Sequence, residues 1–473
     1  MKRVALHNLG CKVNAYEIDI MQQMLVENGY EIVPFDTTAD IYIVNTCTVT
    51  NIADRKSRQM LHQAKSRNPK AIVVAVGCYV QTGDSDALRK DGVDLAIGNN
   101  RKKDMVEILE NFLKERGNGK NPENRDDIKE QEGFSSAYVP DMSMPCDYEE
   151  MTLTTTAEHC RAYIKIQDGC NQFCSYCIIP YARGRVRSRR WEDIYAEIEG
   201  IAKRGYKEIV LTGIHISSYG IDFDEDAWRR GESVVKVREN GIRDYAGRSR
   251  LIDLLEKING IGGIERIRLS SLEPRIITVE NVERMAKIEK LCPHFHLSLQ
   301  SGNDETLKRM NRHYTTGEYL NGVCLLRKAF VHPAITTDVI VGFPGETGEE
   351  FAKTVEFLKE TNLYEMHIFR YSKRKGTKAA AMPHQVPGPV QRERSKVLFD
   401  MEAAMSREFR AFYVGREVEV LFEEAKRIGG KTYQIGHTRE YVKVAKRSEE
   451  SLANQIIRGR ISEFLQEKIL LME

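Results

Sequence analysis

Three cysteines lie close together as Cys170, Cys174 and Cys177, in the run Cys-Asn-Gln-Phe-Cys-Ser-Tyr-Cys. They follow an apolar stretch at 163–167 that is typical of a β-strand. Three thiolates can hold three irons of a [4Fe–4S] cube and leave the fourth iron open to a small chelating molecule. Zinc is the alternative, but it usually takes four ligands in paired arrangements, and these three cysteines have no matched fourth. The spacing therefore favours an iron–sulfur cluster.

A second set of cysteines is dispersed along the first eighty residues. Cys11, Cys47 and Cys78 each come just after an apolar, strand-like run, at 4–9, 41–45 and 72–76. Because the carboxyl ends of parallel strands share one edge of a sheet, we expect the three thiols to converge there. Small buried cysteines near strands are the alternative explanation. The identical placement on three strands predicts a second cube with one open iron.

The chain has ten cysteines, and the other four show no such pattern: Cys146, Cys160, Cys292 and Cys324. We interpret these four as structural or incidental. A disulfide framework is not expected in an intracellular chain of this size.

Composition limits the classes of protein that fit. The 473 residues suggest about three domains, and a net charge of +2 excludes a generally basic surface, so any nucleic-acid site must be local. A hydrophobic fraction of 41% and a mean hydropathy of −0.46 indicate a globular chain. No apolar run approaches the roughly 18 residues that span a membrane, and the start is too short for a signal peptide. We expect a cytoplasmic protein with no membrane partner.

The fold class expected from these patterns is α/β with three parts. Strand-like and helical stretches alternate in the first hundred residues, which predicts an open parallel sheet over residues 1–115. A polar linker over 116–158 follows. Six further strand-like runs predict an open (β/α)6 barrel over 159–385: 163–167, 208–212, 266–270, 294–300, 336–342 and 366–371. The stretch at 217–250 is an insertion whose role the sequence does not reveal.

The C-terminal region has a different pattern. A connecting helix is expected over 386–414. Short alternating runs at 417–422, 432–437, 441–446 and 456–464 predict a small antiparallel β-barrel over 415–473.

The cysteine run after the first barrel strand resembles the radical S-adenosylmethionine (SAM) superfamily. The resemblance implies that SAM chelates the open iron of the Cys170, Cys174 and Cys177 cluster and is cleaved there to methionine and a 5′-deoxyadenosyl radical. It places an aromatic residue, here Tyr176, beside the adenine. By analogy, the strand ends that hold SAM supply Gly213, Glu273, Gln300 and Gly342.

The order of the parts resembles the methylthiotransferases over nearly the whole chain. In that family the C-terminal barrel is a TRAM domain, an RNA-binding barrel of the OB type. The run Phe173-Cys-Ser-Tyr-Cys-Ile-Ile-Pro-Tyr-Ala-Arg-Gly-Arg is similar to the MtaB-type branch, in which the residue after Arg183-Gly184 is basic, as Arg185 is here. That branch implies a substrate: N6-threonylcarbamoyladenosine at tRNA position 37, with a methylthio group placed on C2.

Five arginines lie between residues 183 and 190, and we take Arg183, Arg185 and Arg187 as candidates to bind the substrate or RNA. Arginine binds carboxylates and phosphates bidentately, which suits an anionic substrate. The alternative is that some of these arginines pair with acidic helices. The C-terminal barrel carries 11 Lys/Arg and 10 Asp/Glu, so RNA binding there rests on the resemblance, and a purely structural cap is the alternative.

The resemblance also implies the reaction and the partners. One SAM methylates a sulfur carried by the cluster of Cys11, Cys47 and Cys78, and a second SAM supplies the radical that activates the substrate carbon. The implied cofactors are two [4Fe–4S] clusters and SAM. The implied partners are the tRNA anticodon stem-loop and an electron-donating reductase or flavodoxin-type protein. Three alternatives remain open: isopentenyladenosine-37 as the substrate, a ribosomal-protein aspartate as the substrate, and a non-catalytic metal-containing RNA-binding protein.

Overall fold

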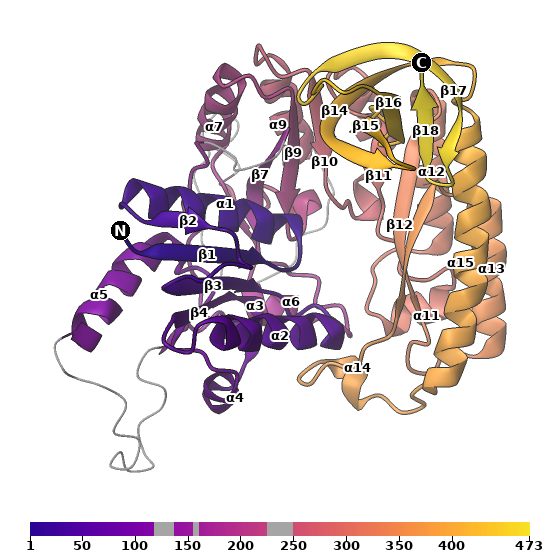
Figure 1. Ribbon diagram of the computed structural model, residues 1–473. Coiled ribbons are helices and arrows are strands. Elements are labelled where there is room, and N and C mark those ends of the chain that lie inside the picture. Colours follow the sequence, from indigo (N-terminus) through magenta and orange to yellow (C-terminus); the bar gives the residue numbers. More distant parts are fainter. Residues whose placement is uncertain (118–136, 155–159, 225–248) are drawn as a thin grey trace.

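The computed structural model describes residues 1–117, 137–154, 160–224 and 249–473. Three units follow one another along the chain (Figure 1): an N-terminal α/β unit, a central set of parallel strands covered by helices, and a small C-terminal β-barrel. The predicted α/β class is confirmed. Within the described residues, no helix is both long and apolar enough to cross a membrane.

The N-terminal unit is a six-stranded parallel sheet with the strand order β2-β1-β3-β4-β5-β6. Its strands are β1 (Arg3–Asn8), β2 (Glu31–Val33), β3 (Ile41–Thr46), β4 (Ile72–Gly77), β5 (Leu95–Ile97) and β6 (Ala137–Tyr138). Every residue of β3 and β4 is buried, as expected for central strands covered on both faces.

Helices cover both faces of this sheet. They are α1 (Lys12–Glu27), α2 (Asn51–Arg67), α3 (Cys78–Thr82), α4 (Ser85–Lys90), the short 3-10 turn η1 (Lys102–Asp104) and α5 (Met105–Gly117). Apolar residues of α1 and α5 pack with Ile41, Ile43 and Val74 on one face. Residues of α2 and α4 pack with the alternate strand positions on the other face. The period of two along each strand therefore produces two separate cores.

The described part of the central unit contains six parallel strands and one short antiparallel strand, arranged in two sheets. One sheet has the order β10-β9-β7-β8 and the other has the order β11-β12-β13. The strands are β7 (Arg161–Asp168), β8 (Arg187–Ser188), β9 (Glu208–Gly213), β10 (Arg266–Leu269), β11 (His294–His296), β12 (Ala334–Val341) and β13 (Glu365–Arg370). Single bridges from Ile267 to Leu291 and from Leu272 to Leu297 join the two sheets, so the strands form one curved, open wall.

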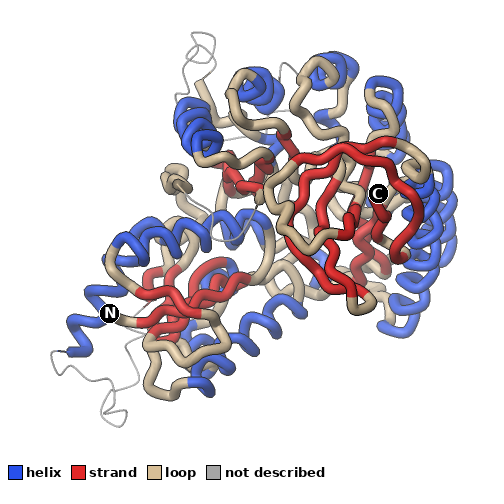
Figure 2. Tube along the Cα trace, turned by 45° about the horizontal axis from the view of Figure 1, so that its top comes forward, coloured by secondary structure: helices blue, strands red, loops and turns tan. Residues whose placement is uncertain are grey.

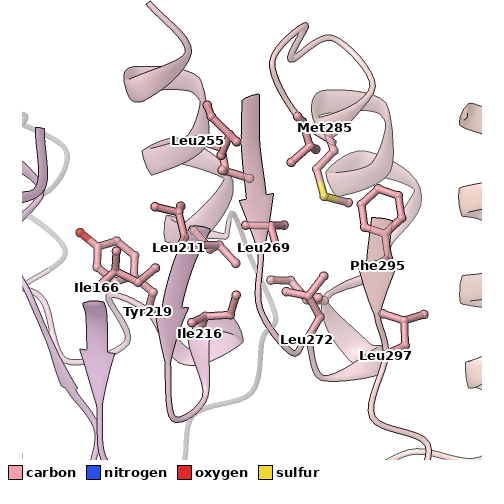
Figure 3. Close-up of a cluster of buried hydrophobic side chains, with 14 of the residues drawn as sticks. Ile166, Leu211, Ile216, Tyr219, Leu255, Leu269, Leu272, Met285, Phe295 and Leu297 are labelled. Carbon is pink, nitrogen blue, oxygen red and sulfur yellow. The ribbon is translucent and has the colours of Figure 1, made fainter. Parts of the chain in front are cut away.

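Helices and 3-10 turns connect these strands, and the longer helices cover the outside of the wall. They are α6 (Ile179–Arg183), α7 (Trp191–Lys203), η2 (Ile216–Ser218), α9 (Arg250–Asn259), η3 (Pro274–Ile276), α10 (Val279–Met285), α11 (Asp304–Arg309), α12 (Thr316–Ala329), α13 (Gly348–Thr361) and α14 (Lys378–Ala381). Alternate strand residues such as Leu211, Leu269 and Phe295 meet helix residues such as Leu255 and Met285 in the largest core of the described chain (Figure 3). The opposite strand positions, largely polar, face the inside of the wall.

The C-terminal unit is a closed barrel with the order β14-β15-β16-β18-β17. Its strands are β14 (Glu417–Ile428), β15 (Lys431–His437), β16 (Lys443–Arg447), β17 (Ile456–Gln466) and β18 (Ile469–Met472), and α15 (Gly388–Ala411) leads into it. Figure 2 shows these strands gathered around the C-terminus. The strand pairs are antiparallel except that β16 and β18 run parallel, which closes the barrel.

The linker predicted at 116–158 differs in part from the prediction, and the insertion predicted at 217–250 is largely not described by the structure. Within the predicted linker, β6 adds an edge strand to the N-terminal sheet, and Met151 and Leu153 are buried in the core of the central unit. These apolar residues are too few to show a period, which is why the sequence did not reveal their packing. Most of the insertion predicted at 217–250 lies outside the described residues.

Candidate functional site

The N-terminal cysteines lie at the ends of three neighbouring strands. Cys11 caps the start of α1, Cys47 directly follows β3, and Cys78 is the first residue of α3 after β4. Strands β1, β3 and β4 are adjacent and parallel, so their carboxyl ends meet at one edge. Cys47 and Cys78 are buried, whereas Cys11 is accessible. The topology therefore brings together the three sulfurs that the sequence singled out.

Gly10 and Asn14 position this first triad. A Cβ atom at Gly10 would lie 2.9 Å from Cys47 Cβ and 3.0 Å from its Sγ, and Gly10 has a φ of +106°. The Asn14 side-chain amide donates to the carbonyls of Leu9 at 2.7 Å and Thr46 at 3.0 Å. These bonds join the loop before Cys11 to the loop before Cys47, so the two cysteines are held side by side.

The cysteine loop of the central unit is fixed by a distant segment. The Asn311 amide donates to the carbonyls of Gln172 and Phe173, at 3.2 and 3.1 Å. The Ser175 hydroxyl donates to Arg309 O at 2.9 Å. Because both contacts come from the C-terminal end of α11 and the residues just after it, this segment fixes the loop that carries Cys170, Cys174 and Cys177.

Gly169 determines how this loop begins. It has a φ of +70°, and an added Cβ would lie 1.8 Å from the carbonyl oxygen of Arg185. Only glycine allows the two chain segments to approach so closely. The Cys170 amide then donates to Gly184 O at 3.0 Å. The first cysteine of the loop is thereby fixed against the segment that carries the arginines.

In each triad, burial and neighbouring cysteines act on the thiols. Burial, with smaller contributions from Cys78 and Cys11, raises the pKa of Cys47 to about 11. Burial and the neighbouring Cys174 raise the pKa of Cys170 to about 12. A bound cation is what makes such thiols into thiolates, with release of protons. The donor sets, three clustered sulfurs each, fit iron–sulfur ligation.

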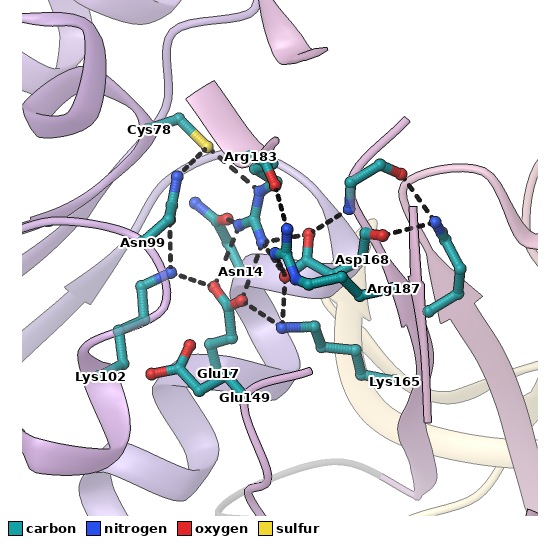
Figure 4. A network of polar contacts seen from close by, with 12 residues as sticks. Asn14, Glu17, Cys78, Asn99, Lys102, Glu149, Lys165, Asp168, Arg183 and Arg187 are labelled. Atoms are coloured by element: carbon teal, nitrogen blue, oxygen red, sulfur yellow. Dashed lines mark hydrogen bonds and ion pairs between the residues drawn. The ribbon is translucent and has the colours of Figure 1, made fainter. Parts of the chain in front are cut away.

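Buried ion pairs link the two triads through Glu17 of α1 (Figure 4). The Glu17 carboxylate bonds Lys102 and lies 2.9 Å from both Lys165 Nζ and Arg183 Nη1. Asp168, two residues before Cys170, lies 3.0 Å from Arg183 Nη1. Burial alone would raise the pKa of Glu17, but Arg183, Lys102 and Lys165 hold that pKa well below its usual range. The network therefore ties the N-terminal unit to the cysteine loop.

Two arginines assigned to substrate or RNA lie inside the protein. Arg183 is 1% exposed, and its Nε donates to the Cys78 sulfur at 3.3 Å, which places its side chain at the first triad. Arg187 is 5% exposed, and its Nη1 donates to the carbonyls of Arg183 and Arg185. Protein groups engage both guanidiniums, as in the alternative that pairs arginines with acidic residues. Arg185 is exposed, with its guanidinium 4.5 Å from the centre of the Phe173 ring.

Three of the predicted SAM contacts lie near the cysteine loop or the ends of the strands. The Tyr176 ring packs edge-on against Phe343, 6.3 Å between ring centres. Gly213 ends β9, where an added Cβ would lie 2.9 Å from Gln167 O. Gly342 follows β12, and its amide donates to the Glu346 carboxylate at 2.6 Å.

The other two predicted SAM contacts, Glu273 and Gln300, are largely buried, at 3% and 8% exposed. Glu273 caps η3 and forms a 2.7 Å ion pair with Arg275. Gln300 follows β11, has a φ of +70° and bridges to Val339 of β12. All five candidates thus lie at or just after the ends of wall strands, or on the cysteine loop.

Positive charge gathers next to Cys11. Burial, together with the charges of Arg268 and Arg161, lowers the pKa of Lys12 to about 8. Those two guanidiniums lie 4.8 and 5.0 Å from the Tyr441 ring centre, in the C-terminal barrel. The N-terminal and central units therefore place positive charge beside the first triad, and the C-terminal barrel contributes the Tyr441 ring that both guanidiniums contact.

A further polar group lies on the inner face of the wall. His296 of β11, Asp338 of β12 and His367 of β13 have ligand atoms within 4.8 Å of one another. Such a set could hold a divalent cation. His296 Nε2 and Asp338 Oδ2 are 3.3 Å apart, a contact that an ordinary ion pair also explains.

Several positioning residues were missed by the sequence analysis: Gly10, Lys12, Asn14, Glu17, Gly169 and Arg312. Arg312 Nη1 donates to the Cys174 sulfur at 3.3 Å, as Arg183 does to Cys78. One signal was available in the sequence, because Gly10 and Gly169 each directly precede a cysteine of one triad. The charged residues gave no signal, since a lone Glu or Arg in a sequence usually lies at the surface.

Comparisons with known proteins agree with this arrangement. Residues 164–358 match the radical SAM superfamily, and residues 3–98 match the uncharacterized protein family UPF0004. The solved structure of the radical SAM methyltransferase TsrM from Kitasatospora setae, with tryptophan and a SAM analogue bound, shares the fold. It has a TM-score of 0.52 and 14% identity, covering 78% of this chain and 73% of that one.

Curated relatives extend over nearly the whole chain. The threonylcarbamoyladenosine tRNA methylthiotransferase MtaB of Bacillus subtilis is 37% identical, covering 98% of this chain and 94% of the relative. MtaB of Aquifex aeolicus is also 37% identical, over 91% and 95%. The tRNA-2-methylthio-N(6)-dimethylallyladenosine synthase of Acetivibrio thermocellus is 31% identical, over 98% and 88%. Two cysteine triads, a radical SAM wall and these relatives together place the chain in the radical SAM methylthiotransferase family.

Proposed function

We propose that this enzyme methylthiolates C2 of N6-threonylcarbamoyladenosine at position 37 of tRNA. The observation that carries the proposal is the meeting of Cys11, Cys47 and Cys78 at one sheet edge, linked by buried ion pairs to the loop of Cys170, Cys174 and Cys177. Relatives named for this reaction match nearly the whole chain. The net change replaces the C2–H bond with a C2–S bond to a methylthio group.

In this proposal the two triads hold two [4Fe–4S] clusters. When bound, the clusters and SAM supply a methylated sulfur and a radical able to remove the C2 hydrogen, which is neither acidic nor hydridic. The chain's own residues hold and orient these groups. Gly10 and Asn14 keep Cys11 beside Cys47, while Asn311 and Ser175 keep the second loop in place.

SAM is proposed to bind at the C-terminal ends of the wall strands. Tyr176 would lie beside the adenine, and Gly213, Glu273, Gln300 and Gly342 would line the strand ends. Their placement after β9, β11 and β12 or near η3 supports the proposal, because ligands of parallel α/β folds bind at that edge.

The charge around Cys11 supports an anionic substrate. Lys12, Arg161 and Arg268 place positive charge next to the first triad. The threonylcarbamoyl group carries a carboxylate, whereas an isopentenyl group is uncharged. This difference favours the threonylcarbamoyl nucleoside as the substrate over its isopentenyl counterpart.

We propose that the C-terminal barrel contacts the tRNA as a TRAM-like unit. Lys426, Tyr433 and Arg447 are neighbours across β14, β15 and β16, and both basic side chains are exposed. Arg427 and Lys431 are exposed at the adjoining hairpin turn. This basic end of the hairpin, together with Arg185, would bind phosphates of the anticodon stem-loop. A reductase or flavodoxin-type protein would supply the electron for SAM cleavage.

The test is reconstitution of the full chain with iron and sulfide, followed by reaction with SAM, a reductant and tRNA stem-loops carrying either modified adenosine. Mass spectrometry of the digested nucleosides should find 2-methylthio-N6-threonylcarbamoyladenosine. A methylthio product from the isopentenyl stem-loop alone would overturn the proposed substrate. Metal and RNA binding without 5′-deoxyadenosine would overturn the reaction.

A further inference from the structure

Three side chains of metal-binding type come from three adjacent strands of the wall: His296 of β11, Asp338 of β12 and His367 of β13. In the strand register, His296 is opposite Thr336, and Asp338 is opposite His367. Because residues 336 and 338 are two apart on one strand, all four side chains lie on the same face of the sheet. Ile335, the residue before Thr336, packs in the core on the other face. The register therefore directs two imidazoles and one carboxylate to the inner face of the wall.

The ligand atoms of His296, Asp338 and His367 all lie within 4.8 Å of one another. The two imidazole rings are stacked, with their centres 5.6 Å apart. The side chains of His296 and Asp338 are 12% and 27% exposed, whereas His367 is exposed. An ordinary ion pair would need only one imidazole beside the carboxylate. The second imidazole, supplied by a third strand, makes the group a set of three converging lone-pair donors.

Thr336 orients His296 from the side away from the carboxylate. His296 Nδ1 lies 3.0 Å from the Thr336 hydroxyl, and His296 Nε2 lies 3.3 Å from Asp338 Oδ2. A histidine that binds a metal through one nitrogen usually donates its other N–H to an oxygen, which fixes the tautomer. Thr336 would accept that N–H and leave the lone pair of Nε2 for an ion. The backbone beside the carboxylate is also held, because the Gln300 amide donates to Asp338 O at 2.8 Å.

We propose that His296, Asp338 and His367 bind a divalent transition-metal ion, with zinc as the expected occupant. Imidazole nitrogens and carboxylate oxygens are ligands that zinc takes, and three protein ligands leave a position for water. The ion would be a metal centre separate from both cysteine triads. The inference does not rest on the proposed function, because the ion needs neither a cluster nor tRNA to bind.

The experiment measures zinc in the full chain after both clusters have been reconstituted. The holoenzyme is freed of loosely bound metal, equilibrated with Zn²⁺ and desalted, and iron and zinc are determined by mass spectrometry in the same sample. The wild type should retain about one zinc per chain, and His367→Gln about none, with iron unchanged. His367 is exposed, so this change leaves the core intact. Thr336→Val keeps all three ligands and should weaken zinc affinity roughly 10-fold or more.

His62→Gln is the matched control. His62 Nε2 also lies 3.3 Å from a carboxylate, that of Asp91, but among the described residues this pair belongs to no group of three ligand side chains. X-ray absorption at the zinc edge should show nitrogen and oxygen neighbours at about 2.0–2.1 Å and no sulfur at about 2.3 Å. A sulfur neighbour would place the zinc at a cysteine triad and overturn the site. Equal zinc loss in His62→Gln, or a wild type that retains no zinc, would overturn it as well.

Discussion

Cys170, Cys174 and Cys177 lie on one short loop, whereas Cys11, Cys47 and Cys78 come from three strand ends separated by whole helices. The loop triad is defined by local spacing and by Gly169, Ser175 and Asn311, which fix its backbone. The dispersed triad exists only when β1, β3 and β4 are paired in register. The comparison teaches that the first site depends on loop geometry and the second on the integrity of a whole sheet.

The two triads also share one kind of contact, a hydrogen bond from an arginine to a cysteine sulfur. One guanidinium donates to one sulfur in each, Arg183 to Cys78 and Arg312 to Cys174, both at 3.3 Å. Hydrogen bonds to cluster sulfurs are among the factors that set reduction potential. Because the partners behind the two guanidiniums differ, the two proposed clusters would have different reduction potentials. Arg183 is held by Glu17 and Asp168, and Arg312 by Tyr314.

The largest expected effect concerns the dispersed triad alone. Gly10→Ala places a methyl group within 3.0 Å of Cys47 at a φ of +106°, so Cys47 must move. Iron per reconstituted chain should fall from about eight atoms to about four, since each cube holds four. Gly205→Ala is the matched control, because Gly205 has a φ of +90° with nothing within 4 Å of the added methyl. Unchanged iron in Gly10→Ala would contradict this packing account.

Glu17→Gln should weaken the connection between the triads. Removing one partner of a buried ion-pair network costs about 3–5 kcal/mol, because Lys102, Lys165 and Arg183 would be left without their shared carboxylate. The free energy of unfolding in urea measures the change. Asp86→Asn, which removes an exposed pair with Arg89, should change it by less than about 1 kcal/mol.

Acid should reduce the difference between wild type and Glu17→Gln. The pKa of Glu17 is well below 4.5 in the folded protein and near 4.5 when unfolded, so its ionisation stabilises the protein fully above that value. This contribution is lost as the pH falls below 4.5 towards the folded pKa. Urea midpoints between pH 7 and pH 3.5 should converge for the two proteins. A constant difference across that range would show that Glu17 stabilises without its charge.

Arg183→Lys should lower the reduction potential of the cluster at Cys11, Cys47 and Cys78 and leave the other potential unchanged. The lysine keeps a charge for Glu17 and Asp168 but loses the Nε donor to Cys78. Arg312→Lys should do the reverse. Redox titrations followed by electron paramagnetic resonance, in variants that retain one triad, separate the two signals. Equal shifts at both clusters would point to a general structural effect.

The smallest effect is expected at the RNA surface. Arg185→Ala removes an exposed guanidinium stacked on Phe173, so tRNA affinity should fall a few-fold and the salt dependence of binding should become slightly shallower. Arg190→Ala is the control, since Arg190 is also exposed but already lies near Glu192 and Asp193. Filter binding at several salt concentrations measures both. An equal loss in the two variants would remove any special role from Arg185.

The fold and the triads were largely predictable because their signals are periodic or local. The runs at 163–167 and 208–212 lie within β7 and β9, and the connecting helix expected over 386–414 contains α15. Short edge elements such as β2 and β6 carry too few residues for a visible period. The burial of Arg183 could not be predicted from the sequence. It depends on ion pairs with Glu17 and Asp168, and these residues come together only when the units are assembled.

Replacing one cysteine in each triad separately tests most directly whether one triad cleaves SAM and the other delivers the methylthio sulfur. 5′-Deoxyadenosine and methylthiolated nucleoside would be quantified in the same reaction, with the threonylcarbamoyl stem-loop as substrate. Cys174→Ala should abolish both products, whereas Cys47→Ala should still form 5′-deoxyadenosine but no methylthiolated nucleoside. Methylthiolated nucleoside from Cys47→Ala would contradict the account, because the dispersed triad would then have no part in delivering sulfur.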